Sequence, residues 1–309
     1  MSEPGSRVMS ALAALRDELR ARHGWTHVDV SVGVDADARR LVLRGEVAVE
    51  RLVGRVVEVA AAAAPGWAIE PEALRVMDGG TWHALPLVEL DPVVLWAACP
   101  ERAADRRVAT ELRPEDGPLQ RLGAHAGWTV ARGRDGTVGW LEGGGGVEVP
   151  APRLPAPHGD DPEGLVREAR SWLGVPYRLG GVTKQAVDCS ALVQRLLFDQ
   201  LGVLVPRHSS DQLLVAPRPG KGTGPGDLVF VWSARESLRG MCHVGIAAGG
   251  SVIHASLSRR GVVEDTTAEF LADARGVMHV PFGELLAFGR RVAGHASLVA
   301  AGVRLGAQP

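Results

Sequence analysis

The chain has 309 residues, more than one hydrophobic core usually organises, which predicts two or three domains. Its composition, 46% hydrophobic and 23% charged, is typical of globular proteins and argues against a disordered or fibrous chain. A formal net charge of -2 offers no broad basic surface, so we expect no nucleic-acid partner. Three cysteines, Cys99, Cys189 and Cys242, cannot form a dense disulfide framework, which favours a reducing compartment.

The first residues form an arginine-rich amphipathic pattern without the apolar core and cleavage site of a secretory leader. The longest apolar stretch, Val56 to Ala64, contains Glu58 and is too short to span a bilayer. We therefore expect a cytoplasmic location and no membrane span, with leaderless export as the alternative.

Residues 1–78 are expected to form a small α+β module. The hydrophobic pattern predicts, in chain order, a helix over 8–22, strands over 27–34 and 40–47, a helix over 49–64 and a strand over 67–76. This order resembles the BON module of bacterial envelope proteins. An unspecified α+β module is the alternative.

Residues 79–149 carry short alternating runs separated by turn residues, which predict a small β barrel. The stretch 127–141, with a Gly-Trp pair at its start, resembles bacterial SH3-like domains. Trp128 and Trp140 are expected in the barrel core, or alternatively along a substrate groove. The segment 150–162 is rich in Gly and Pro and is interpreted as a linker.

Cys189 is the first candidate for chemistry. Apolar side chains recur at three- and four-residue intervals after it, so a helix is expected to begin there with Asp188 as its N-cap. Unpaired amides and the helix dipole favour a negative sulfur, which predicts a lowered thiol pKa and a nucleophilic thiolate. Free cysteines are often buried and inert, so this residue alone leaves a structural role open.

His243 begins an apolar, strand-like run, and a second run over 251–255 follows Gly249 and Gly250. The two runs predict a β-hairpin, which would bring His254 beside His243. Nucleophile, base and orienting group would then form a triad.

Three motifs carry a family resemblance: Asp188-Cys189-Ser190-Ala191-Leu192-Val193, His243-Val244-Gly245-Ile246 and His254-Ala255. In order and spacing they resemble the NlpC-type cell-wall peptidases, a papain-like family. The resemblance covers residues 165–270 and implies an α+β catalytic domain over 163–309, with the nucleophile on a helix and the base on an antiparallel sheet.

The resemblance also implies residue roles. Cys189 would be the nucleophile, His243 the base and His254 the group that orients it. Tyr177, twelve residues before the cysteine, would help to hold the tetrahedral oxyanion. The alternative for this tyrosine is a place in the core.

A subgroup with SH3-like domains cleaves the γ-D-glutamyl-diamino acid bond of muropeptides that have a free N-terminal L-alanine, in cell-wall recycling. Similarity to it implies substrate contacts by Asp188, Ser190, His208, Ser209 and Asp116. For Asp116, and for the adjacent Glu115, the alternative is a solvated turn residue. The chain departs from the subgroup at four positions: His208 replaces an aspartate, Thr137 a tyrosine, Ala191 a glycine and Leu179 a tryptophan. Because the first two departures remove a carboxylate and a phenol from the expected ammonium pocket, the resemblance supports the catalytic machinery more strongly than the substrate.

Two other functions stay open: a non-catalytic cell-wall peptide-binding protein, and an acyltransferase that uses the same thiol. Histidines without paired ligand spacing predict neither a metal nor another cofactor, and Cys242 is expected to be an inert neighbour of the base. Peptidoglycan peptides are the expected partners. The tail after residue 271 shows a helix-like stretch over 282–286 and gives no functional signal, and the sequence does not indicate an oligomeric state.

Overall fold

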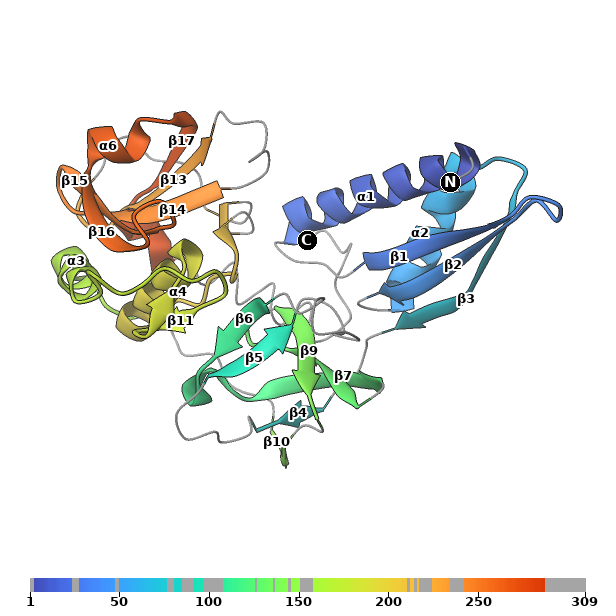
Figure 1. Cartoon of the computed structure of the whole chain (residues 1–309), viewed down its shortest axis with the longest axis horizontal. Helices are drawn as coiled ribbons and strands as arrows, with labels where there is room; N and C mark the ends of the chain where they lie inside the picture. Colours follow the sequence, from blue (N-terminus) through green and yellow to red (C-terminus); the bar gives the residue numbers. More distant parts are fainter. Residues whose placement is uncertain are drawn as a thin grey trace. The chain divides into compact units, whose positions relative to one another are not determined.

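The computed structural model divides the chain into two compact units, residues 1–80 and 81–296 (Figure 1). Within them it describes residues 3–23, 28–47, 50–76, 81–84, 92–96, 108–125, 127–135, 137–143, 146–150, 158–209, 212–213, 216, 224–233 and 242–286. Among these residues no helix is long and apolar enough to cross a membrane. Both units mix helices with sheets, so the chain has the α+β class expected from the sequence.

The first unit has the predicted order of elements. These are α1 (Glu3–His23), β1 (Val28–Asp35), β2 (Arg40–Val47), α2 (Glu50–Ala63) and β3 (Ala68–Val76). β1 and β2 pair antiparallel, whereas β2 and β3 pair parallel, since α2 forms the crossover that parallel neighbours require. The two helices share one apolar core with the sheet, and every second residue of β1 and β2 points into it: Val28, Val30, Leu41 and Leu43.

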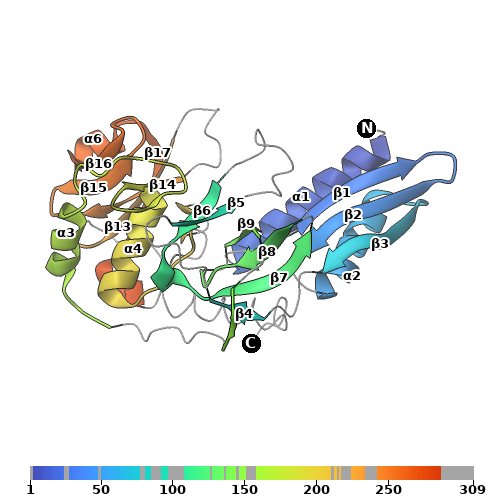
Figure 2. The same ribbon diagram turned by 60° about the horizontal axis from the view of Figure 1, so that its bottom comes forward.

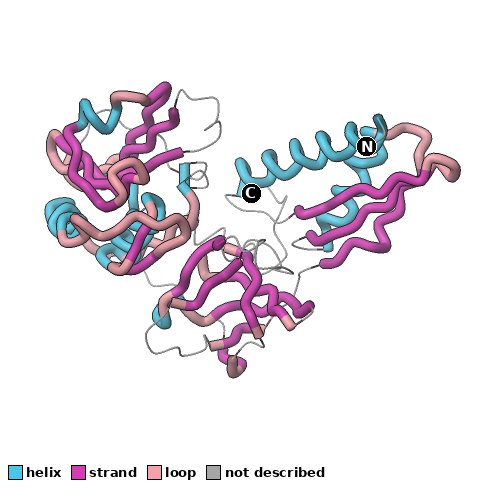
Figure 3. Tube along the Cα trace, in the orientation of Figure 1, coloured by secondary structure: helices cyan, strands magenta, loops and turns pink. Residues whose placement is uncertain are grey.

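The second unit begins with a seven-stranded sheet, whose strands Figure 3 shows in magenta. The strands are β4 (Trp82–His83), β5 (Val93–Trp96), β6 (Val108–Leu112), β7 (Leu119–His125), β8 (Trp128–Arg132), β9 (Val138–Glu142) and β10 (Glu148–Val149). Their order is β10-β4-β7-β8-β9-β5-β6. The predicted hairpin is β8 and β9, in which Val130 faces Trp140. Both tryptophans of the hairpin are partly buried.

The C-terminal part of this unit surrounds a five-stranded antiparallel sheet in the order β16-β15-β14-β13-β17. Its elements are α3 (Pro162–Arg170), β11 (Val182–Thr183), β12 (Ala186–Val187), α4 (Cys189–Leu201), β13 (Leu228–Ser233), β14 (Cys242–Ala247), β15 (Ser251–Ser256), β16 (Gly261–Thr266), α6 (Thr267–Leu271) and β17 (Ala274–Val280). A short helix over 282–286 follows, where the sequence predicted one. Most of the linker predicted over 150–162 lies outside the described residues.

Alternation along the strands gives this sheet two apolar faces. Phe230, Val244 and Ile246 belong to the core shared with α3 and α4. Val229, Val231 and Val252 point the other way and pack with Phe270 of α6. Figure 2 shows α4 and α6 with the strands between them. The helix that begins at Cys189 therefore packs on the sheet whose strands β14 and β15 carry the two histidines.

Candidate active site

Cys189 occupies the first position of α4, as the sequence predicts. The Asp188 carboxylate caps the helix by accepting the main-chain N–H of Ala191, at 2.9 Å. Gly202, with a φ of 62°, ends the helix in the left-handed region that favours glycine. The thiol is thus fixed at the positive end of a helix whose later turns are buried in the core.

Arg207 holds Asp188 in place. Its guanidinium donates to both carboxylate oxygens, at 2.8 and 2.7 Å, and also to the Ser190 hydroxyl, at 3.1 Å. The Gly180 main-chain N–H donates to the same carboxylate at 2.8 Å. Burial works to raise the pKa of Asp188, but Arg207 and the N–H donors outweigh it and hold that pKa below its usual range.

The predicted contact of Asp188 and Ser190 with a substrate ammonium stays a prediction. Asp188 is only 3% exposed, and each of its oxygens already accepts from at least two donors. Ser190 is likewise buried and donates to Asp188 at 3.2 Å. We assign both residues a supporting role, because they align the start of the helix that carries the thiol.

The base and its orienting group lie on neighbouring strands, as the hairpin predicted. β14 and β15 pair through Ile246 and Ile253, and Gly249 and Gly250 between them have φ values of 79° and 130°. The His243 Nε2 and His254 Nδ1 atoms are 2.8 Å apart. The two rings meet edge to face and both pack on Phe270, with ring centroids 5.5 and 4.8 Å away.

Asp265 extends this line of groups, and the sequence reasoning did not single it out. Its Oδ2 lies 3.3 Å from Nε2 of His254, and its Oδ1 accepts from Arg259 at 3.3 Å. The residue lies on β16, where it pairs with Val252. The only signal in the sequence was an acidic residue in the strand after His254, and its contact follows from strand register.

The expectation of a lowered pKa for Cys189 is wrong. Burial raises the pKa of this thiol to about 12, and the negative charge of Asp188 adds to the effect. The main-chain N–H groups of Val244 and Ser190 act in the opposite direction, as the helix argument required, but they are weaker than burial. The interaction with Val244 also places the sulfur beside the segment that carries His243.

The imidazole is neutral for the same reason. Burial, followed by repulsion from His254, lowers the pKa of His243 to about 3. Both shifts favour the neutral forms of the thiol and the imidazole over an ion pair. Burial also raises the thiol pKa of Cys242 to about 12, and its expected role as an inert neighbour stays a prediction.

Tyr177 is half-buried and packs against the core beside the nucleophile. Burial raises the pKa of its hydroxyl, and the electrostatic influence of the adjacent Cys189 and Asp188 acts in the same direction. The phenol therefore stays protonated and can only stabilise an oxyanion as a hydrogen-bond donor. Its main-chain N–H donates to the carbonyl of Arg260 at 3.0 Å, which fixes the loop that carries it.

The other predicted substrate contacts lie at different places. His208 is exposed, next to the buried Arg207. The Ser209 hydroxyl donates to the carbonyl of Cys242, the residue before the base. Both therefore lie on the loop that borders the site, and their contact with substrate stays a prediction.

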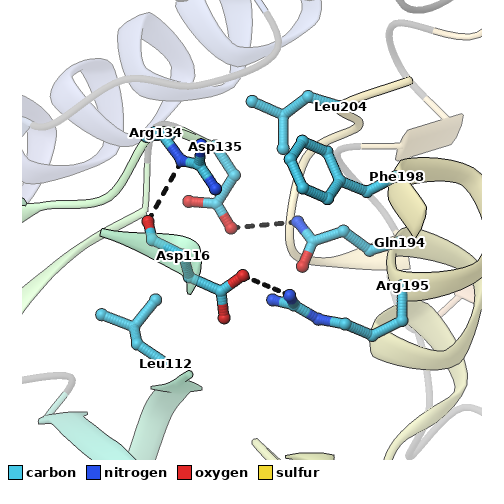
Figure 4. Close-up of a pocket in the computed structure, with 8 residues that line it drawn as sticks. All are labelled: Leu112, Asp116, Arg134, Asp135, Gln194, Arg195, Phe198 and Leu204. Atoms are coloured by element: carbon cyan, nitrogen blue, oxygen red, sulfur yellow. Dashed lines mark hydrogen bonds and ion pairs between the residues drawn. The ribbon is translucent and has the colours of Figure 1, made fainter. Parts of the chain in front are cut away.

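Asp116 contacts a part of α4 remote from the nucleophile. It forms a buried ion pair with Arg195, which follows Cys189 by six residues, about 9 Å along a helix. Figure 4 shows the pair in a small pocket that is also lined by Arg134, Asp135 and Gln194. Asp116 is therefore a buried partner of the helix rather than a solvated turn residue, and the structure does not bring it to Cys189.

Glu111 of β6 lies closer to the site and was missed by sequence reasoning. Its main-chain N–H donates to the carbonyl of Gly180 at 2.9 Å, and the N–H of the same glycine donates to Asp188. Its carboxylate is buried and accepts from Arg178 through Oε1, whereas Oε2 has no hydrogen-bond partner. No sequence pattern marked this residue, because its contacts are made with residues distant in the sequence.

A helix-borne thiol, a strand-borne imidazole with a second imidazole behind it and a protonated phenol are the groups that a papain-like cysteine peptidase uses. Among the described residues no group of three or more metal-ligating side chains accompanies it. The arrangement can form an acyl-enzyme: the imidazole takes the thiol proton while the sulfur attacks an amide carbonyl.

This part of the chain, residues 174–278, matches the model of the NlpC/P60 family. It is similar to the gamma-DL-glutamyl hydrolase of Bacillus subtilis, at 32% identity over 40% of the chain and 30% of that protein. It is also similar to the probable endopeptidase NlpC of Escherichia coli, at 38% identity over 31% of the chain and 62% of that protein. Less than two thirds of either relative is matched.

Among solved structures, an NlpC/P60 family protein from Bacillus cereus aligns at 18% identity over 64% of the chain and 62% of that protein, with a TM-score of 0.34. The RipB peptidoglycan hydrolase of Mycobacterium tuberculosis aligns at 27% identity over 39% of the chain and 64% of that protein, with a TM-score of 0.30.

Proposed function

We propose that the protein is a cysteine endopeptidase that hydrolyses amide bonds in the stem peptides of peptidoglycan. The observation that carries this proposal is the hydrogen bond of 2.8 Å between His243 and His254, next to a thiol at a helix start. In the first step the sulfur of Cys189 bonds to the substrate carbonyl carbon and its proton passes to His243. The imidazolium then protonates the leaving amine as the C–N bond breaks, and water releases the acyl group.

For the bond that is cut, we propose the γ-D-glutamyl-diamino acid linkage of small muropeptides, as in wall recycling. The name of the Bacillus subtilis relative, a gamma-DL-glutamyl hydrolase, supports the γ-glutamyl part of this proposal. We further propose that Glu111 holds the free ammonium of the substrate, a role first expected of Asp116. Two observations support this proposal: its unpartnered Oε2 can accept a hydrogen bond, and its main-chain N–H donates to Gly180, the residue whose own N–H donates to Asp188.

We also infer that the seven-stranded sheet is an SH3-like barrel and that residues 1–78 are a BON-like module. The hairpin of β8 and β9 and the helix, strand, strand, helix, strand order support these assignments. For the barrel, the contact of Glu111 with Gly180 provides a route by which it can contribute to substrate binding.

The test is hydrolysis of L-Ala-γ-D-Glu-diaminopimelate by the full-length protein, followed by mass spectrometry. Release of diaminopimelate by the wild type, and not by Cys189→Ala, is the expected result. If folded wild-type protein cleaves no stem peptide of any length, the endopeptidase proposal is wrong. Transfer of the acyl group to an added amine in place of water would instead identify an acyltransferase.

The role of Glu111 predicts a change in substrate preference. Glu111→Gln should raise KM for the free tripeptide about tenfold, because it removes one charge-assisted bond, and should leave KM for the N-acetylated tripeptide unchanged. Glu115→Gln is the matched control, since this carboxylate is 57% exposed on the turn after β6. Equal KM values of the Glu111→Gln variant and the wild type for the free peptide would contradict the role of Glu111.

A further inference from the structure

Asp265 completes a row of polar groups that starts at the base. His243 contacts His254 at 2.8 Å, His254 contacts Asp265 at 3.3 Å, and Asp265 contacts Arg259 at 3.3 Å. The side chains of His254 and Asp265 are only 6% and 15% exposed, so water competes little for these bonds.

The row determines where the protons lie. An ionised carboxylate accepts hydrogen bonds and donates none, so Nε2 of His254 must carry the proton that Asp265 receives. A neutral imidazole holds one N–H, so Nδ1 of His254 is then a lone pair and accepts from Nε2 of His243. As a result His243 is left with a lone pair on Nδ1, the atom that can take the thiol proton.

Without the carboxylate the opposite arrangement is equally possible. Nδ1 of His254 could donate to Nε2 of His243, which would force the proton of His243 onto Nδ1. In that tautomer His243 has no lone pair available for the thiol. The packing of both rings against Phe270 holds them in place but does not distinguish the two tautomers.

We propose that Asp265 is a positioning residue of the active site, which selects the tautomer of His254 and through it presents the basic nitrogen of His243 to Cys189. This inference rests on the proposed function. The same carboxylate also stabilises the positive charge that develops on the imidazole pair when the thiol proton is transferred.

The experiment combines tautomer assignment with kinetics in the full-length chain. Histidine ¹⁵N labelling and long-range ¹H–¹⁵N spectra should show both His243 and His254 protonated on Nε2 in the wild type near pH 7.5. In Asp265→Asn the side-chain amide can donate as well as accept, so a mixture of tautomers is expected. The kcat value should fall about 10- to 100-fold with KM within about twofold. Asp265→Glu should recover part of the lost kcat.

Glu264→Gln is the matched control. Its carboxylate is the neighbour of Asp265 on β16, but it binds Arg170 and Ser251. This variant loses a comparable ion pair and should keep the tautomers and kcat of the wild type.

Two results would overturn the proposal: Nδ1 protonation of His254 in the wild type, or a folded Asp265→Asn protein with unchanged tautomers and kcat. If that variant does not fold, the wild-type spectra still decide. If no peptide is hydrolysed, the tautomers still test the role of Asp265, so the two proposals fail separately.

Discussion

Burial favours the neutral forms of both the thiol and the imidazole of the site. It raises the pKa of Cys189 to about 12 and lowers that of His243 to about 3. In the proposed mechanism, proton transfer therefore accompanies the attack on the substrate, with His243 as a general base rather than as the partner of a preformed thiolate. This makes the tautomer of the imidazole more important than it would be in an ion pair.

Alkylation of Cys189 by iodoacetamide tests this state. Because the reactive thiolate is a small fraction far below the thiol pKa, the rate should rise about tenfold for each pH unit between 6 and 8. The rate is measured by mass spectrometry of the peptide that contains Cys189, and Cys242 in the same protein provides an internal comparison with a similarly raised pKa. A rate that is high and flat from pH 6 upward would contradict the neutral pair.

The residues that could be recognised from the sequence are those whose role follows from their immediate neighbours in the chain. Asp188 could be predicted as an N-cap because capping needs only a short polar side chain before an apolar helix. The direction of the Cys189 pKa shift could not be predicted, since it depends on burial by residues distant in sequence. Glu111 and Asp265 were missed for a related reason: each reaches the site through tertiary packing and strand register.

Among the elements, β14 and β15 set the spacing of the two histidines, and Gly245 permits their close approach. A Cβ atom at this position would lie 2.5 Å from Cγ1 of Val252, 3.0 Å from the Ile253 carbonyl oxygen and 3.1 Å from Cβ of His254. The strands could accept a methyl group only by moving apart. The close approach of the two strands therefore explains why the His-Val-Gly-Ile motif has a glycine at this position.

Gly245→Ala should lower kcat at least about tenfold and destabilise the fold by about 1–3 kcal/mol, because the overpacked strands lengthen the contact between His243 and His254. Steady-state kinetics and urea unfolding measure the two effects. Gly54→Ala is the control: its Cβ would meet no atom within 4 Å in helix α2, so stability should rise by about 0.5–1 kcal/mol with unchanged kcat. Wild-type kcat in Gly245→Ala would show that the strand spacing is not limiting.

Most individual helices and hairpins could be predicted from the sequence. Helices and hairpins are set by local periodicity and turn residues, so the elements of residues 3–76 and the β8–β9 and β14–β15 hairpins could be predicted. Sheet order was not predictable in the same way. The position of β5 between β9 and β6, for example, follows from pairing between strands that are far apart in the sequence.

On the scale of the whole molecule, buried polar contacts join the seven-stranded sheet to the cysteine helix within residues 81–296. Asp116 pairs with Arg195, and Asp135 accepts from Gln194 at 3.0 Å. The sequence predicted two domains here, at 79–149 and 163–309, with a linker between them. It could not predict that charged residues would be buried between them, because charges are usually found in solvent.

Asp116→Asn should destabilise this unit by about 3–5 kcal/mol, because the guanidinium of Arg195 would stay buried without its counter-charge. Hydrogen exchange of the α4 amides as a function of urea reports the change. Replacing the pair together, by Asp116→Leu with Arg195→Met, should recover most of the loss, since no isolated charge remains. A free energy of unfolding for Asp116→Asn within about 0.5 kcal/mol of the wild-type value would contradict this account.

Arg207 also has a consequence for any attempt to study the peptidase by itself. Its Nε donates to the hydroxyl of Thr110 on β6 at 2.7 Å, while its two terminal nitrogens bind Asp188. A fragment that begins after residue 149 would retain the cap of α4 but lose Thr110. The Nε donor of Arg207, a side chain that is only 2% exposed, would then need a water molecule as its acceptor. Kinetic constants from such a shortened protein would describe a Cys189 whose N-cap, Asp188, is bound by an arginine that has lost one of its hydrogen bonds.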